Sequence, residues 1–133
     1  MINKKMLETG IKGNGRVQTD ESNSARTMGS GTLDVFATPA MIALMEKTAW
    51  QSVAPYLEEG QGTVGIRLEI SHDAPTPFGM TVTCESELVE IDGRRLVFEV
   101  TAKDEHGTVI GQGRHERFIT TEETFQKKAE AAH

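Results

Sequence analysis

Three side chains in this sequence have the chemical types used in acid–base and nucleophilic catalysis: the Thr38 hydroxyl, the Glu46 carboxylate and the His72 imidazole. A carboxylate and an imidazole can move protons to and from water near neutral pH, and a hydroxyl can attack a carbonyl group or hydrogen-bond to it. Each side chain also has a simpler explanation. Glu46 would then be a polar residue paired with an arginine or with backbone, His72 a structural histidine, and Thr38 a helix cap.

A helix is predicted to carry the first two of these residues. It begins at Thr38-Pro39, because a threonine side chain can accept an unpaired N–H of the first turn and proline loses no hydrogen bond at the first helical position. Apolar residues on several sides of the segment from Ala40 to Leu57 indicate a helix that is buried on most sides. Pro55 fits poorly inside a helix, so we expect an irregular last turn.

Glu46 lies in line with Ile42 and Trp50, so its carboxylate projects from an apolar stripe of this helix. A carboxylate in that position needs a partner or a function. Thr38 and Glu46 are separated by roughly 12 Å along the helix, because each residue adds about 1.5 Å. We therefore expect Thr38, Glu46 and His72 to act together only across a dimer interface or with substrate between them.

After the helix the hydrophobic period changes to two, which predicts strands. Val64, Ile66, Leu68 and Ile70 share one face of the first strand if it is regular. His72 has the same parity, so its ring is expected on the face of the sheet that packs against the helix.

Two turn signals connect the later apolar runs. Asp92-Gly93 predicts a tight hairpin, and Glu105-His106-Gly107 predicts a second one before a last run at residues 108–120. The result is an antiparallel meander. His106 is interpreted as a solvent-exposed turn residue.

The last run carries Gly111 and Gly113, where missing side chains let a sheet bend or a helix lie close. A weaker strand near residues 16–19 precedes the helix. Together these elements predict an α+β fold in which a curved antiparallel sheet wraps around one long central helix, the hotdog layout. The edges of such a sheet favour pairing of two protomers into a homodimer.

Length and composition limit the class of protein. A chain of 133 residues with 20 acidic and 14 basic side chains has a net charge of −6, which argues against nucleic acid or an anionic membrane as partner. The single cysteine, Cys84, can form neither an intrachain disulfide nor a cysteine-based metal site, and no signal-peptide-like or membrane-spanning run is present. The four histidines lack close metal-ligand spacing. We therefore expect a cytoplasmic protein without metal or other cofactor, whose partner is a small molecule or another protein.

Residues 1–133 are predicted to form one domain. Residues 21–34 are polar and glycine-rich, and a loop of this length is typical of a lid or binding loop; a disordered surface loop is the alternative. Residues 121–133 are expected to form a polar C-terminal helix or tail.

Several short segments between Val35 and Ile119 occur together and in order. They are Phe36-Ala37-Thr38, Met45-Glu46, Ala54-Pro55-Tyr56-Leu57-Glu58, Ser71-His72, Gly93-Arg94-Arg95-Leu96 and Gly113-Arg114-His115-Glu116-Arg117. This set resembles the fluoroacetyl-CoA thioesterase-like branch of the hotdog-fold thioesterases. His115 itself is interpreted as part of a structural charged cluster with Glu116 and Arg117.

The resemblance implies hydrolysis of a small acyl-CoA thioester to free acid and CoA. It implies that Thr38, Glu46 and His72 form the catalytic set, that Gly65 lies at the reacting carbonyl, and that Arg117 contacts substrate. The sequence departs from fluoroacetyl-CoA-specific proteins at residues 28–33, where Met-Gly-Ser-Gly-Thr-Leu replaces aromatic lid residues. We therefore expect a broader or different small acyl group. The alternatives are a hotdog enoyl-CoA hydratase and a non-catalytic acyl-CoA-binding module.

Overall fold

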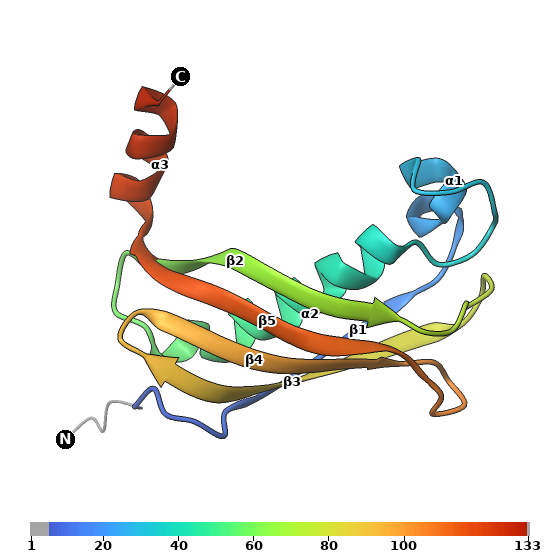
Figure 1. The fold of residues 1–133 in the computed structure, drawn as a ribbon, viewed down its shortest axis with the longest axis horizontal. Coiled ribbons are helices and arrows are strands. Elements are labelled where there is room, and N and C mark those ends of the chain that lie inside the picture. Colours follow the sequence, from blue (N-terminus) through green and yellow to red (C-terminus); the bar gives the residue numbers. More distant parts are fainter. Residues whose placement is uncertain (1–5, 133) are drawn as a thin grey trace.

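The computed structural model describes residues 6–132, which form one five-stranded sheet with a long helix across it (Figure 1). The elements in chain order are β1 (Lys12–Gln18), the 3-10 helix η1 (Glu21–Asn23), α1 (Ala25–Met28), α2 (Thr38–Val53), the 3-10 helix η2 (Ala54–Tyr56), β2 (Gln61–His72), β3 (Thr81–Asp92), β4 (Arg95–Lys103), β5 (Val109–Thr121) and α3 (Glu122–Ala131). The long helix α2 ends before Pro55, which lies in η2 as the expected irregular last turn.

The strands pair in the order β1-β3-β4-β5-β2, and every neighbouring pair is antiparallel. Both predicted hairpins are present, with Gly93 and Gly107 at φ of 60° and 80°, a conformation that glycine adopts without strain. The sheet curves around α2, which packs mainly on β1, β3 and β4 (Figure 1). The curved sheet wrapped around one central helix is thus confirmed, and β2 is its outermost strand beside β5.

The core lies between α2 and the concave face of the sheet. Its fully buried members on the helix are Met41, Met45, Ala49 and Val53. Gly111 of β5 permits a close approach of the helix to this strand, since a Cβ there would lie 2.5 Å from the Met41 sulfur. The expectation that a glycine lets the helix lie close to the last strand is therefore correct.

A β-bulge interrupts β2 at Ile66. Gly65 is opposite Arg117 and Arg67 is opposite Glu116, so Ile66 is the extra residue. The bulge reverses the side-chain alternation within the strand. Val64 pairs with the outward-facing Phe118, and its predicted place on the face of Leu68 and Ile70 is wrong.

The same bulge explains why two distant positions of β2 both face the helix. Gly65 is opposite the buried Arg117, and His72 is opposite Gly111, which lies against the helix. In a regular strand, residues an odd number apart point to opposite faces. The inserted residue therefore brings Gly65 to the face of the sheet that packs against α2. His72 lies on this same face, as predicted.

Residues 21–34 contain two short helices, η1 and α1, where the sequence predicts only a loop. The Asp20 side chain caps η1, and the Ser24 hydroxyl caps α1 by accepting from the Thr27 N–H at 3.1 Å. Backbone bonds of 2.9 Å from Ala25 N to Val35 O and from Ala37 N to Asn23 O tie the segment to the start of α2. Within residues 6–132, no helix has the length and apolar character needed to cross a membrane.

Candidate active site

The Thr38 hydroxyl contacts His72 and does not cap the helix. Thr38 is the first residue of α2; the cap position is Ala37, and no side chain caps the helix there. The prediction that Thr38 caps the helix is therefore wrong. Its Oγ1 atom lies 2.7 Å from Nδ1 of His72, the last residue of β2. The end of this strand therefore lies beside the start of the helix.

The surroundings of His72 favour its neutral form. Partial burial lowers the pKa of His72 below its ordinary value of 6.5, and the neighbouring Asp73 carboxylate opposes this only in part. A neutral ring can accept the Thr38 hydroxyl hydrogen at Nδ1 and then carries its own hydrogen on Nε2. The Nε2 atom is buried and has no hydrogen-bond partner within the described residues.

A hollow of about 270 Å³ opens beside this pair. Its lining includes Thr38, His72, Asp73 and two residues of the 21–34 segment, Ala25 and Ser30. The remaining wall residues are Val35, Phe36, Ala74 and Pro75. The hydroxyl and the imidazole thus border a space bounded mostly by small side chains.

Glu46 belongs to a second group of residues. One of its carboxylate oxygens lies 3.3 Å from Nη1 of Arg117, whose side chain is 7% exposed. A Cβ on Gly65 would lie 2.8 Å from that same oxygen, so the glycine backbone lies directly against the carboxylate. The arginine pairing considered for Glu46 from sequence is present, and it brings together Glu46, Gly65 and Arg117.

Arg117 is held from several sides. Its Nε atom donates to the Thr63 hydroxyl at 2.8 Å, and Nη2 donates to the Thr63 carbonyl at 2.9 Å. Nη1 lies 3.0 Å from Nε2 of His115 in addition to its contact with Glu46. Burial lowers the pKa of Arg117, and Glu46 opposes the shift. The guanidinium is therefore a fixed part of the site, with few hydrogens left for a ligand.

The two groups are separate within one chain. Among residues 6–132, no hydrogen bond or ion pair joins Glu46 to Thr38 or His72. This agrees with the distance along α2 expected from sequence. The structure brings together two of the three predicted catalytic residues, and it places the third with the two predicted substrate-binding residues.

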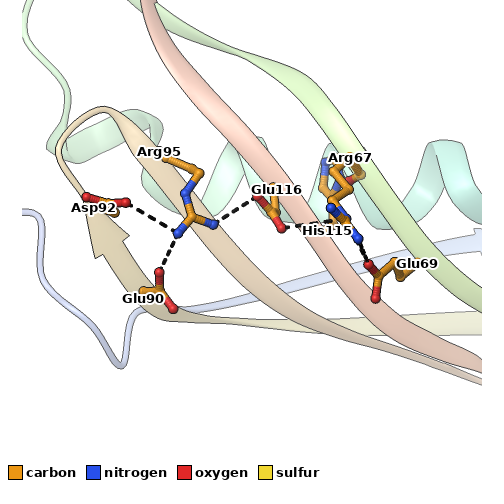
Figure 2. A network of polar contacts seen from close by, with 7 residues as sticks. All are labelled: Arg67, Glu69, Glu90, Asp92, Arg95, His115 and Glu116. Carbon is orange, nitrogen blue, oxygen red and sulfur yellow. Dashed lines mark hydrogen bonds and ion pairs between the residues drawn. The ribbon is translucent and has the colours of Figure 1, made fainter.

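The sequence did not single out His115 as part of this site. Its neighbour Glu116 points to the opposite face of the sheet, where it binds Arg95 at 2.9 Å and lies 4.0 Å from Arg67 (Figure 2). Arg67, Glu69, Glu90, Asp92, Arg95 and Glu116 form a charged network on that outer face (Figure 2). His115 instead shares the inner face with Arg117, and the two-residue spacing is the signal that could have separated it from Glu116.

Solved structures with this fold define the class of protein. The chain superimposes on a fluoroacetyl-CoA thioesterase with a TM-score of 0.89 at 33% identity, covering 96% of this chain and 98% of that one. A variant of that enzyme in complex with acetyl-CoA gives 0.89 at 32% identity, covering 95% and 98%. A Thermus thermophilus protein described as a thioesterase superfamily member gives 0.82 at 27% identity, covering 98% and 97%. The predicted hotdog thioesterase fold is confirmed.

Sequence comparison gives the family. The profile of the fluoroacetyl-CoA-specific thioesterase family matches residues 19–123. The fluoroacetyl-CoA thioesterase of Streptantibioticus cattleyicolor is 44% identical over 95 residues, which are 71% of this chain and 68% of that protein. This chain belongs to the fluoroacetyl-CoA-specific thioesterase family. The predicted family and the predicted enzyme class, a thioester hydrolase, are confirmed.

Proposed function

We propose that this protein hydrolyses the thioester of a small acyl-CoA, with Thr38, Glu46 and His72 as its catalytic residues. The observation that carries the proposal is the 2.7 Å contact between the Thr38 hydroxyl and His72 Nδ1, beside a hollow, in a chain of the thioesterase family. A hydroxyl on a neutral imidazole is the arrangement that nucleophilic and general-base catalysis require.

In the proposed reaction, Glu46 and His72 provide acid–base function, and His72 takes a proton either from Thr38 or from a water molecule that the Thr38 hydroxyl orients. The oxygen attacks the thioester carbonyl, and the resulting oxyanion is stabilised by backbone N–H groups near Gly65. Collapse of this intermediate breaks the C–S bond, and the leaving CoA thiolate receives the proton from His72. If Thr38 attacks, water then hydrolyses the acyl-threonine by the same steps. Rapid quenching with labelled acyl-CoA distinguishes the routes, because only the first leaves label on Thr38.

We propose a homodimer in which the β2 edges of two protomers pair antiparallel. Ile66 and Leu68 on this edge strand are 50% and 43% exposed, which is unusual for apolar side chains next to a candidate site. Gly65 and His72 are roughly 23 Å apart along the strand, at about 3.3 Å per residue. A two-fold axis between Leu68 and Glu69 is equidistant from both, and it would put Gly65 and Glu46 of one protomer next to His72 of the partner subunit.

The proposed acyl group is small and is not restricted to fluoroacetyl. The 21–34 segment would act as the lid of the acyl site, because Ala25 and Ser30 already line the hollow. Its glycines and small side chains leave more room than aromatic residues would. The acidic composition and the single cysteine support a cytoplasmic protein without nucleic-acid or membrane partners.

The test is CoA release from a panel of short and medium acyl-CoAs that includes fluoroacetyl-CoA. We expect turnover of at least one member, and we expect it to fall about 100-fold or more in both His72→Ala and Glu46→Ala, the range for loss of acid–base function. His106→Ala, in the β4–β5 hairpin, is the matched control and should keep wild-type turnover. Absence of release from every member, or indifference to both substitutions, would refute the proposal. Hydration of crotonyl-CoA without CoA release would instead indicate a hydratase.

A further inference from the structure

His115 is a fully buried imidazole whose two ring nitrogens both have defined partners. Nδ1 lies 2.9 Å from the backbone carbonyl of Arg67. A carbonyl only accepts hydrogen bonds, so Nδ1 carries the ring hydrogen. The Nε2 atom of the neutral ring is then an acceptor, and it lies 3.0 Å from the donor Nη1 of Arg117.

The groups around His115 keep this ring neutral. Burial lowers the pKa of His115, and the Arg117 charge lowers it further; the Arg67 carbonyl and the carboxylates of Glu46 and Glu116 oppose these effects without reversing them. A second ring proton would sit on Nε2 and face the Arg117 guanidinium. The neutral Nδ1–H form is therefore the one that fits the surrounding donors and acceptors.

His115 and Glu46 share one nitrogen of Arg117. Nη1 carries two hydrogens, of which one is directed to His115 Nε2 and the other to the Glu46 carboxylate at 3.3 Å. The guanidinium is planar, so fixing one of these hydrogens also fixes the direction of the other. Thr63 holds the guanidinium at Nε and Nη2, and His115 fixes it at Nη1, the nitrogen that offers a hydrogen bond to Glu46.

The same ring also contacts the strand segment that presents Gly65. Its Nδ1 bond goes to Arg67, the residue directly after the bulged Ile66, and its Cε1 atom would lie 3.2 Å from a Cβ on Gly65. One buried ring therefore links the backbone after the bulge to the arginine that holds Glu46.

We propose that His115 is a positioning residue of this site: as a neutral Nδ1–H imidazole, it orients Arg117 and, through Arg117, the Glu46 carboxylate against Gly65. This inference rests on the proposed thioesterase function. It assigns no contact between His115 and the substrate.

Three substitutions separate this role from simple core packing. His115→Gln places an amide oxygen near the position of Nε2 and keeps an acceptor for Arg117. His115→Asn reaches only the position of Nδ1, so it can bond the Arg67 carbonyl but not Arg117. His115→Leu fills the space and makes neither bond. Thermal melting and circular dichroism give the folded fraction of each variant, to which turnover is normalised.

We expect the Gln variant to keep kcat within about tenfold of wild type. We expect the Asn and Leu variants to lose about 100-fold in kcat, the scale that misplacement of a catalytic group by about 1 Å produces, while KM changes by less than about threefold. A purely structural role predicts similar loss of stability in all three variants and unchanged kcat per folded molecule. Folded Asn and Leu variants with wild-type kcat would therefore overturn the inference.

A second readout does not depend on activity. Long-range ¹H–¹⁵N spectra of the histidine rings at pH 7 should show His115 as the neutral Nδ1–H form, assigned by its absence in His115→Gln. An Nε2–H or doubly protonated His115 would overturn the inference even in an active enzyme. A wild type that cleaves no acyl-CoA would refute the proposed function and the inference with it, whereas an active wild type with active Asn and Leu variants would refute the inference alone.

Discussion

The two ring nitrogens of His72 have different surroundings, and this asymmetry determines how the histidine can act. Nδ1 is paired with the Thr38 hydroxyl, whereas Nε2 has no partner in the described part of the chain. A base that already contacts its hydroxyl needs no rearrangement before it takes the proton. This role requires that the ring be neutral in the free enzyme.

The pH dependence of kcat/KM should report this requirement. Burial lowers the pKa of His72 below 6.5, so the ring stays neutral at pH 7 and becomes protonated only as the pH falls through the lowered value. We therefore expect kcat/KM to be constant near pH 7 and to decline on the acid side with an inflection below 6.5. Titration of the His72 ring by NMR should follow the same curve. An inflection above 6.5 would contradict the assignment.

The Thr38 hydroxyl should matter far more for turnover than for stability. Thr38→Val keeps the shape of the side chain and removes the hydroxyl, so we expect turnover to fall about 100-fold. The free energy of unfolding should fall by no more than about 1 kcal/mol, because the single bond to His72 is lost and no capping bond is. Thr38→Ser, which keeps the hydroxyl, is the matched control and should stay within tenfold of wild type. Turnover of Thr38→Val equal to that of wild type would contradict the proposed role of the hydroxyl.

At the scale of elements, the bulge in β2 determines which residues enter the site. It places Gly65 on the helix side of the sheet, where the backbone meets the Glu46 carboxylate. Residue 65 is therefore a glycine because the neighbouring side chains leave no room for a Cβ atom. A Cβ would lie closer to the carboxylate than real Cβ atoms approach their neighbours, and its contact with the His115 ring would be tighter than most real ones.

Gly65→Ala should consequently displace Glu46. The added carbon would lie 2.8 Å from the Glu46 oxygen, and we expect kcat to fall about 10- to 100-fold through misplacement of that carboxylate. Gly62→Ala in the same strand is the matched control, because the atoms nearest to its Cβ belong to the side chain of Glu122 and not to Glu46. Steady-state kinetics of the two variants make the comparison. Equal activity of Gly65→Ala and wild type would show that the Glu46 position is not critical.

Periodicity predicted most of these elements but not the bulge. The long helix, the later strands and both hairpins follow from apolar spacing and turn residues, which are local signals. The bulge depends on how β2 pairs with β5. In the sequence Ile66 fits the regular alternation of apolar residues, but in the sheet it is the extra residue that has no partner in β5. The sequence also grouped His115 with both Glu116 and Arg117; the contact with Arg117 is present, and alternation within β5 could have separated Glu116. The bulge itself is the reason that the sequence assigned Val64 to the wrong face. Contacts between distant segments determine these details.

At the scale of the whole molecule, one chain holds the proposed catalytic residues in two separate groups. Thr38 contacts His72 at the start of α2, and Glu46, two turns further along the helix, contacts Arg117 and lies against Gly65. The proposed pairing of β2 edges would assemble each complete site from two protomers. Activity would then depend on which chains are combined.

Heterodimers test this arrangement directly. A His72→Ala chain and a Glu46→Ala chain, carrying different affinity tags and purified together, should form one intact and one doubly defective site, and so give about half of the wild-type activity from two individually inactive parents. A heterodimer of His72→Ala with Thr38→Ala is the matched control. Both of its chains are defective in the same group of residues, so it should remain inactive. Equal inactivity of the two heterodimers would show that each site lies within one chain.

The extra residue in β2 also limits how this gene can change. Deletion of a single codon at Ile66 would leave a strand with a more regular pairing to β5, and such a change would look harmless in a sequence. It would nevertheless turn one half of the strand over, so that either Gly65 or His72 would leave the concave face. We therefore expect family members that retain both Gly65 and His72 to tolerate substitutions of Ile66. A change in the number of residues between Gly65 and His72 should be tolerated far less.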